Sequence, residues 1–238
     1  MRIRNPSRTR SPKRRSLLGW IIRILAGLFL FSVLWVGLYR FINPPVTVRM
    51  LQSTLSGHSV QRDWMPIREI DRNAVRAVIA AEDARFCQHN GFDFNAIEKA
   101  AQRNATGKRI RGGSTISQQT AKNAFLWPAR SYVRKGLEAY FTALIELLWS
   151  KKRIMEVYLN IAETGVGVFG VNAGAQHYFG HDASRLSPAE AARLAAILPQ
   201  PVKRTAAAPK GYTRRYAGRI QKRIGVVRRD GLMGCVVG

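Results

Sequence analysis

Cysteine and acidic side chains are scarce in this sequence, and the scarcity of cysteine excludes one class of site. The two cysteines, Cys87 and Cys235, lie far apart and form neither a CxxC pair nor a zinc-binding spacing. Since there are only four histidines as well, a metal centre of the Cys/His type is excluded. A disulfide between the two cysteines and two free thiols both remain open. We expect free thiols, because Cys235 lies in what reads as a loose C-terminal tail.

The shortage of acidic residues leaves the chain strongly basic. It has 14 Asp and Glu against 39 Lys and Arg, which gives a net charge of +25. Such a charge predicts an anionic partner: nucleic acid, an anionic lipid surface or a phosphorylated substrate. Composition does not choose among these three. A hydrophobic content of 46% over 238 residues excludes a disordered chain and allows one or two domains, with one core as the default.

Charge is absent from one long segment, which predicts a membrane anchor. Residues 24–39 form an uncharged run of 16, and a span over 17–39 has 23 residues. About 20 helical residues cross a bilayer core, and Arg23 is near enough to one end to reach the lipid headgroups. A cleaved signal peptide is the alternative, but the apolar run is too long and no A-x-A site follows it. We assign residues 17–41 to a transmembrane anchor.

The charges beside this span predict its orientation. Residues 1–16 carry seven Lys and Arg and no acid, and such a short basic segment stays in the cytoplasm. The rest of the chain then lies across the membrane, which argues against nucleic acid and leaves lipid headgroups or phosphorylated lipid-linked substrates. The predicted organisation is a basic tail over 1–16, the anchor over 17–41, a main domain over 45–210, and a basic C-terminal helix and tail over 211–238.

Helical patterns dominate after residue 45, so we predict a mainly α fold. Strand signals are weak, and residues 46–51, VTVRML, read as a short strand or an extended linker. The glycines of ETGVGVFGVNAG loosely resemble GxGxxG but lie outside any βαβ unit, which argues against a dinucleotide site. Residues 187–190, SPAE, form a capping box with proline at its second position. The expected helix caps are Asp93, Ser114, Ser131 and Ser187.

Residues 203–229 combine ten basic side chains with apolar residues at helical spacing. Such a basic amphipathic helix can lie on anionic lipid. It can equally pack its apolar side on the domain and leave its basic side in solvent, and the sequence leaves both open. The residues at helical spacing are Tyr216, Ile220, Ile224 and Val227.

One acid lies where a helix should be apolar. In residues 71–86, DRNAVRAVIAAEDARF, Glu82 shares a helix face with four apolar residues. It is either a structural acid neutralised by arginine or backbone donors, or a general acid or base whose pKa is raised by apolar surroundings. Asp83 is adjacent to it, and His89 follows the expected helix end. The four apolar residues are Val75, Val78, Ile79 and Phe86.

A polar cluster follows in residues 111–123, RGGSTISQQTAKN. Ser114, Gln118 and Lys122 recur every four residues, with Gln119 and Asn123 adjacent to them. So many polar groups on neighbouring faces indicate that this helix does not pack a core there and suit a surface that holds a sugar or phosphate. The alternative is a solvent-facing helix, although exposed helices usually favour Glu and Lys.

Glu138 is a second acid on an apolar helix face, which it shares with Phe141 and Ile145. Arg134 lies four residues before it, a spacing that is common for surface ion pairs. Two acids beside a group of cations suit a reaction at a sugar carbon that bears a phosphate leaving group. The cations of this group are Lys122, Arg130, Arg134 and Lys135.

Five segments resemble, in the same order, the motifs of glycosyltransferase family 51. They are EDARFCQHNG, GGSTISQQTAKN, RKGLEAYFTALIE, KKRIMEVYLNIAE and GVFGVNAGAQHYFG, between residues 82 and 180. With its flanks the resemblance covers about residues 50–210, so the main domain over 45–210 reads as a glycosyltransferase domain. A single anchor without an S-x-x-K module makes the chain similar to the monofunctional biosynthetic peptidoglycan transglycosylases. That resemblance implies a lysozyme-like helical domain.

The resemblance also implies a reaction. The family transfers the lipid-linked growing glycan onto lipid II, with inversion and a β-1,4 link, and releases undecaprenyl diphosphate. Glu82 would be the general base and Glu138 an assisting acid in the donor site. Lys122 and Arg130 would neutralise the leaving pyrophosphate, with Mg²⁺ or Mn²⁺ assisting although no protein metal site is implied. The residues implied to bind or position substrate also include Ser114, Gln118, Gln119, Asp83, His89, Asn123 and Arg134.

The implied partners are lipid II, the lipid-linked glycan, the inner membrane and other proteins of cell-wall synthesis, with nucleic acid excluded. The implied location is the cell inner membrane, with a cytoplasmic N-terminus and a periplasmic catalytic domain. Two rival functions remain open. A lysozyme-like lytic enzyme would cut glycan with Glu82 and would not need Lys122 or Arg130. A non-enzymatic basic binding protein would not need Glu82.

Overall fold

The computed structural model describes residues 17–105, 113–129 and 131–237, and the chain divides into two compact units. The first unit is Met1–Trp35 and the second is Val36–Gly238. The predicted cytoplasmic tail over 1–16 lies outside the described residues, as does Arg130.

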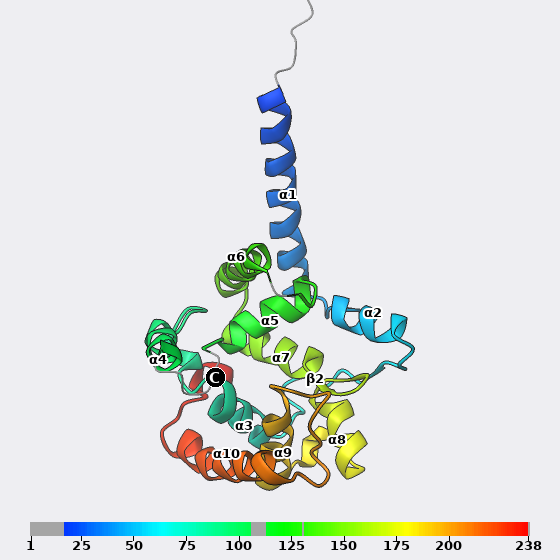
Figure 1. The fold of residues 1–238 in the computed structure, drawn as a ribbon, viewed down its shortest axis with the longest axis vertical. Coiled ribbons are helices and arrows are strands. Elements are labelled where there is room, and N and C mark those ends of the chain that lie inside the picture. The colour runs from blue at the N-terminus through cyan, green and yellow to red at the C-terminus, as the bar shows by residue number, and fades with distance from the viewer. Residues whose placement is uncertain (1–16, 106–112, 130, 238) are drawn as a thin grey trace, which may run out of the picture. The chain divides into compact units, whose positions relative to one another are not determined.

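Helix α1, Leu17–Tyr39, is the apolar helix drawn in blue in Figure 1. It is long and apolar enough to cross a membrane. Large side chains along it, such as Leu25 and Phe31, are exposed, as expected where the neighbours of a helix are lipid chains. The helix ends two residues before the predicted end of the anchor at residue 41. The structure thus fits a membrane anchor.

The last turn of α1 belongs to the second unit, where other side chains hold it. Val36 is fully buried, and Trp149 Nε1 donates a 2.8 Å hydrogen bond to its carbonyl oxygen. Arg153 donates from Nε and Nη2 to the Tyr39 carbonyl, at 3.1 and 2.9 Å. The Tyr39 ring also stacks on Phe125, with centroids 5.6 Å apart. Carbonyls that a helix end leaves open are thereby satisfied.

The second unit is mainly helical, as predicted, with a small three-stranded sheet (Figure 1). Two 3₁₀ turns cover Phe86–Gln88 and Ala183–Arg185. The strands are β1 (Gln61–Arg62), β2 (Glu163–Gly165) and β3 (Val168–Phe169). The helices are α2 (Val48–Leu55), α3 (Arg72–Glu82), α4 (Phe94–Ala105), α5 (Ile116–Phe125), α6 (Tyr132–Leu148), α7 (Lys151–Ile161), α8 (Val171–Phe179), α9 (Pro188–Ile197), α10 (Gly211–Arg229) and α11 (Gly234–Val237).

Two groups of helices build the core. Helices α3, α9 and α10 pack together, and α5 packs against α6 and α7. Both groups bury apolar side chains almost completely, which supplies the main driving force for folding. Examples are Ile79, Ile116, Ile145, Tyr158 and Ile197.

The glycine-rich segment forms part of the sheet. Strand β3 lies between β1, which is parallel to it, and β2, which is antiparallel. Gly170 follows β3 with φ 88°, a backbone conformation that favours glycine. A Cβ atom at Gly170 would lie 2.9 Å from the Asn160 carbonyl oxygen. Close backbone packing thus accounts for this glycine without a nucleotide.

Three of the predicted helix caps are confirmed. The side chains of Ser131 and Asp93 accept hydrogen bonds from backbone N–H groups three residues ahead, at 3.2 and 3.0 Å. Ser187 forms the predicted capping box with Glu190. Short-range sequence patterns are therefore reliable at these three helix starts.

Three local predictions are wrong. Helix α5 is capped by Thr115 rather than Ser114, because Thr115 forms a capping box with Gln118. Residues 48–55, of which 48–51 were expected as strand or linker, form α2, whose cap Thr47 accepts from the third backbone N–H ahead. Helix α3 ends at Glu82 and does not continue to Phe86, which begins a 3₁₀ turn.

The C-terminal segment is packed, so the expectation of free thiols is wrong. Helix α10 packs on α3 and α9 and buries Ile220, Ile224 and Val227, as the packing alternative requires. Helix α11 then contacts α7 and the 3₁₀ turn that contains Cys87. Cys87 and Cys235 form a disulfide with their Cα atoms 5.5 Å apart. The tail that reads as loose in sequence is held against the core.

Candidate active site

Glu82 is the last residue of α3 and reaches toward α5. Its Oε2 accepts a 2.7 Å hydrogen bond from Gln119 Nε2. Its Oε1 is buried and has no hydrogen-bond partner among the described residues. Burial raises the pKa of the Glu82 carboxyl, while the Gln119 hydrogen bond and the charge of Lys122 act in the opposite direction. Glu82 can therefore accept a proton on Oε1.

Two tyrosines that sequence reasoning missed surround Glu82. Tyr158 on α7 is buried and donates to Gln119 Oε1 at 3.3 Å, so Gln119 is held on both sides of its amide. Tyr216 on α10 donates to the Ala81 carbonyl at 3.0 Å. Burial is the largest cause that raises the pKa of Tyr216, to about 12, and the negative charge of Glu82 adds to it. Both hydroxyls stay neutral at physiological pH.

Asp83 and His89 connect α3 to the start of α5. His89 Nε2 lies 3.0 Å from both carboxylate oxygens of Asp83, and the Ile116 N–H donates to Asp83 Oδ2 at 3.1 Å. The Gly91 N–H donates to His89 Nδ1 at 3.2 Å, which places the ring proton on Nε2 in the neutral histidine. Asp83 thus accepts the first N–H of α5, in addition to the Thr115 cap, and the pair positions Glu82 relative to Gln119.

Lys122 lies in the last turn of α5, electrostatically coupled to both predicted acids. Burial lowers its pKa, and the negative charges of Glu138 and Glu82 act in the opposite direction. Glu138 on α6 is buried and ion-paired with Arg134 at 3.0 Å and with Lys135. Arg134 Nε is buried and has no hydrogen-bond partner among the described residues. The predicted cations therefore lie close to the acids: Arg134 and Lys135 pair with Glu138, and Lys122 is close to both Glu138 and Glu82.

A cavity of about 570 Å³ opens beside these groups. Its polar lining includes Gln119, Lys122, Asn123, Arg134 and Tyr158, and the segment after α9 contributes apolar residues. Arg49 on α2 also lines the cavity and pairs with Glu163 at 2.9 Å. Arg49 is not among the predicted site residues, because residues 46–51 read in sequence as a strand or linker. The cavity can hold a polar, anionic ligand beside Glu82.

The structure separates the predicted site residues into two sets. Gln119, Lys122, Asn123 and Arg134 line the cavity. Glu82 and Glu138 do not line it but contact two lining residues, Gln119 and Arg134.

The second set lies elsewhere. Asp83 and His89 lie behind Glu82, and Ser114 is exposed at the start of α5. Gln118 is buried, and its amide oxygen accepts a 3.0 Å hydrogen bond from the Thr115 N–H. The expectation that this helix packs no core is wrong, because Ser117, Gln118 and Thr120 are all buried.

The part of the chain that the structure describes offers no protein-held metal site. Among the described residues, no group of three or more His, Cys, Asp or Glu side chains could hold a metal ion. The carboxylates of the cavity are instead engaged by Gln119, Arg134 and Lys135. The chemistry of the site is therefore derived from the side chains alone.

Comparisons with known proteins agree with this geometry. The family model described as Transglycosylase matches residues 48–224. A biosynthetic peptidoglycan transglycosylase of Caulobacter vibrioides is 53% identical, over 94% of this chain and 96% of the relative. Proteins of the same description are 47% identical in Rhodospirillum centenum, over 93% and 96%, and 51% identical in Pseudomonas putida, over 85% and 89%. The similarity thus extends over most of the chain.

Proposed function

Because the chain belongs to the transglycosylase family and is a peptidoglycan glycosyltransferase that extends glycan chains, we propose that its acceptor is lipid II and its donor the lipid-linked growing glycan. The observation that carries this proposal is the position of Glu82, held by Gln119 at a cavity that Lys122 and Arg134 also line. A proton acceptor and a cationic wall are the two parts that transfer from a diphosphate requires.

In the proposed reaction Glu82 takes the proton from the 4-hydroxyl of the acceptor's N-acetylglucosamine. The hydroxyl oxygen bonds to the anomeric carbon of the donor's N-acetylmuramic acid, and the bond from that carbon to the diphosphate oxygen breaks. The electron pair leaves with undecaprenyl diphosphate, and inversion gives a β-1,4 link. The buried, unpartnered Oε1 supports this role, because a raised pKa makes the carboxylate a stronger base.

Lys122 and Arg134 would stabilise the negative charge that develops on the leaving diphosphate. Fixed cations act most strongly where charge appears in the transition state, inside a site that excludes water. Arg130, which lies outside the described residues, remains a predicted third cation. A divalent ion, Mg²⁺ or Mn²⁺, is proposed only as a companion of the diphosphate, and no step depends on it.

Glu138 would act through its neighbours. Arg134 pairs with one oxygen of its carboxylate and Lys135 with the other, so both oxygens are already engaged. We assign it the role of holding Arg134 and favouring the charged form of Lys122, because its charge acts on both. Glu138 is thus a positioning residue of the donor side, and Glu82 is the base.

The disulfide supports a location outside the cytoplasm. Disulfides persist in oxidising compartments and are rare in the cytosol, and Cys87 and Cys235 both belong to the second unit. The basic N-terminal segment favours a cytoplasmic N-terminus. We therefore propose a single-pass protein of the inner membrane with a periplasmic catalytic domain. Association with other cell-wall synthesis proteins remains a prediction.

Polymerisation of labelled lipid II by the full chain tests the assignment of the base. We expect Glu82→Gln to lose about 10²–10⁴-fold in rate, the usual contribution of a general base. The matched control is Glu98→Gln, an exposed position on α4, which should polymerise at the wild-type rate. Equal rates for Glu82→Gln and wild type would remove Glu82 from the mechanism.

A further inference from the structure

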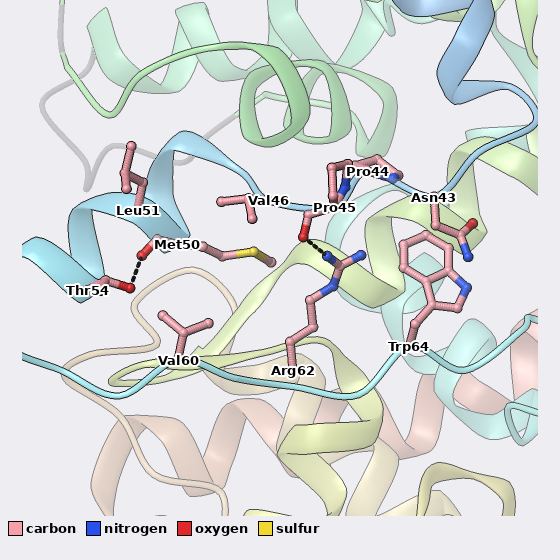
Figure 2. Close-up of a pocket in the computed structure, with 10 residues that line it drawn as sticks. All are labelled: Asn43, Pro44, Pro45, Val46, Met50, Leu51, Thr54, Val60, Arg62 and Trp64. Atoms are coloured by element: carbon pink, nitrogen blue, oxygen red, sulfur yellow. Dashed lines mark hydrogen bonds between the residues drawn. The ribbon is translucent and has the colours of Figure 1, made fainter.

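A second cavity, of about 540 Å³, lies among the segment after α1, helix α2 and strand β1 (Figure 2). It shares no lining residue with the catalytic cavity. Arg62 is the only charged residue that lines it. Figure 2 shows the Arg62 side chain rising toward Pro45, with Met50 on one side and Trp64 on the other. The apolar lining residues include Pro44, Val46, Met50, Leu51 and Val60.

Arg62 is a half-buried cation that pairs with no carboxylate among the residues that the structure describes. Its Nη1 donates to the Pro45 carbonyl at 2.7 Å, and its guanidinium lies 5.0 Å from the centre of a Trp64 ring. Its Nε is buried without a hydrogen-bond partner, and no acidic side chain among the described residues pairs with it. Burial lowers its pKa. An anion in the cavity would offset the cost of this desolvated charge.

The surroundings of the cavity favour lipid over a free anion in water. The lining residues Val46 and Leu51 are 57% and 52% exposed. Phe41, two residues before Asn43, and Leu55, directly after Thr54, are each 80% exposed. Exposed apolar side chains gathered around a cavity in this way mark a contact with another apolar phase. The unpaired cation lies within this apolar surface, as a lipid phosphate beside acyl chains would require.

The chain also places the cavity close to the bilayer. Asn43 lines it and lies four residues after Tyr39, the last residue of the membrane helix. Four residues span at most about 14 Å, and the headgroup layer on each side of a bilayer is about 5–8 Å thick. The first wall of the cavity is therefore within reach of lipid headgroups.

We propose that this cavity binds an anionic phospholipid of the surrounding membrane, with its phosphate on Arg62 and an acyl chain along Val46, Met50 and Leu51. Helix α2 would then stand between two ligands, since Met50 lines this cavity and Arg49 lines the catalytic one. The bound lipid is a structural partner and takes no part in glycan transfer.

Native mass spectrometry of the delipidated full chain in detergent tests this proposal. Short-chain phosphatidylglycerol and phosphatidylcholine with identical acyl chains serve as probes. We expect wild type to bind phosphatidylglycerol about tenfold more tightly than phosphatidylcholine, since charge-assisted hydrogen bonds contribute enough for such a preference. Arg62→Gln should abolish the preference, and Leu51→Asn should weaken binding of both lipids.

The matched control is Arg68→Gln, which removes the same charge from an exposed side chain six residues away and should keep the preference. If Arg62→Gln unfolds, the proposal is still tested by two results, the binding of both lipids by Leu51→Asn and the preference of wild type for phosphatidylglycerol. Equal binding of the two lipids by wild type overturns the proposal. Displacement of phosphatidylglycerol by equimolar inorganic phosphate would make this a simple anion site. Displacement by equimolar undecaprenyl phosphate would make it a site for the substrate's lipid, and either result rejects the phospholipid.

Discussion

Glu82 shows how a single position in the chain sets the pH at which the enzyme works. A general base acts only in its deprotonated form, so activity falls as the pH drops through its pKa. Burial raises that pKa, and the hydrogen bond from Gln119 works against the increase. The acidic limb of the activity profile should therefore lie above the ordinary glutamate pKa of 4.5.

Gln119→Leu removes the donor that stabilises the ionised carboxylate. We expect the pKa of Glu82 to rise further, because its remaining surroundings still disfavour the charge. The acidic limb of kcat/KM, measured by lipid II polymerisation over a series of buffers, should move to higher pH. Gln102→Leu, at an exposed position of α4, should leave it in place. A limb that stays fixed or moves to lower pH argues against Glu82 as the base.

The same carboxylate should lower the stability of the fold at neutral pH. Its folded-state pKa is raised, so the unfolded chain ionises first and the free energy of unfolding falls as pH rises above about 4.5. Glu82→Gln removes this penalty. Its thermal midpoint should exceed that of wild type at neutral pH and match it below the ordinary glutamate pKa. A variant less stable than wild type throughout would show that ionised Glu82 contributes net stability.

The start of α5 shows what sequence patterns can and cannot decide at the scale of one element. Ser114 and Thr115 are adjacent and both suit a helix cap, so the pattern alone does not distinguish them. Thr115 is the cap because its side chain also donates to the Gly91 carbonyl at 2.7 Å, which ties α5 to the turn that follows Cys87 and His89. The spacing of residues around Thr115 does not reveal this contact with Gly91.

Thr115→Ala should therefore destabilise the protein by about 0.5–2 kcal/mol, the usual cost of losing an N-cap. Ser114→Ala, one residue earlier and exposed, should change stability by much less. Denaturant unfolding of both variants, with their midpoints compared, measures the difference. Equal losses in the two variants would mean that the cap is shared.

In helix α3 the helical periodicity predicts the buried side chains correctly and the end of the helix wrongly. The pattern of apolar residues correctly predicted the buried face formed by Val75, Val78 and Ile79. It also included Phe86, which is fully buried although the helix has already ended at Glu82. The chain leaves the helix after Glu82, and the Asp83 carboxylate accepts a hydrogen bond from the Ile116 N–H at the start of α5. Burial of a side chain can thus be predicted more reliably than the backbone that carries it.

At the scale of the whole molecule, the sequence does not show which distant segments contact each other. Both acids could be predicted, since a carboxylate on an apolar face is visible in one helix. Tyr158 and Tyr216 could not, because they donate to Gln119 and to the Ala81 carbonyl from helices far along the chain. The disulfide was missed for the same reason, as 148 residues separate its cysteines.

Breaking this disulfide should destabilise the fold while the chemistry survives. Cys87→Ser should lower the free energy of unfolding by about 2–5 kcal/mol, because a long loop is no longer closed. Polymerisation should continue at temperatures where the variant stays folded, since Cys87 and Cys235 line neither cavity. Thermal unfolding with and without a reducing agent provides the measurement. Cys235→Ser and the double variant should match Cys87→Ser, and additive losses would contradict a shared bond.

A shortened chain that begins after residue 45 would lose contacts inside the second unit as well as its membrane anchor. The Trp149 indole would have no acceptor, Arg153 would lose the Tyr39 carbonyl, and Phe125 would lose a stacked ring. Donors stripped of their partners in this way weaken a core. Soluble fragments made for crystallisation or screening should therefore start at or before Val36, since constants measured on shorter ones would describe a damaged enzyme.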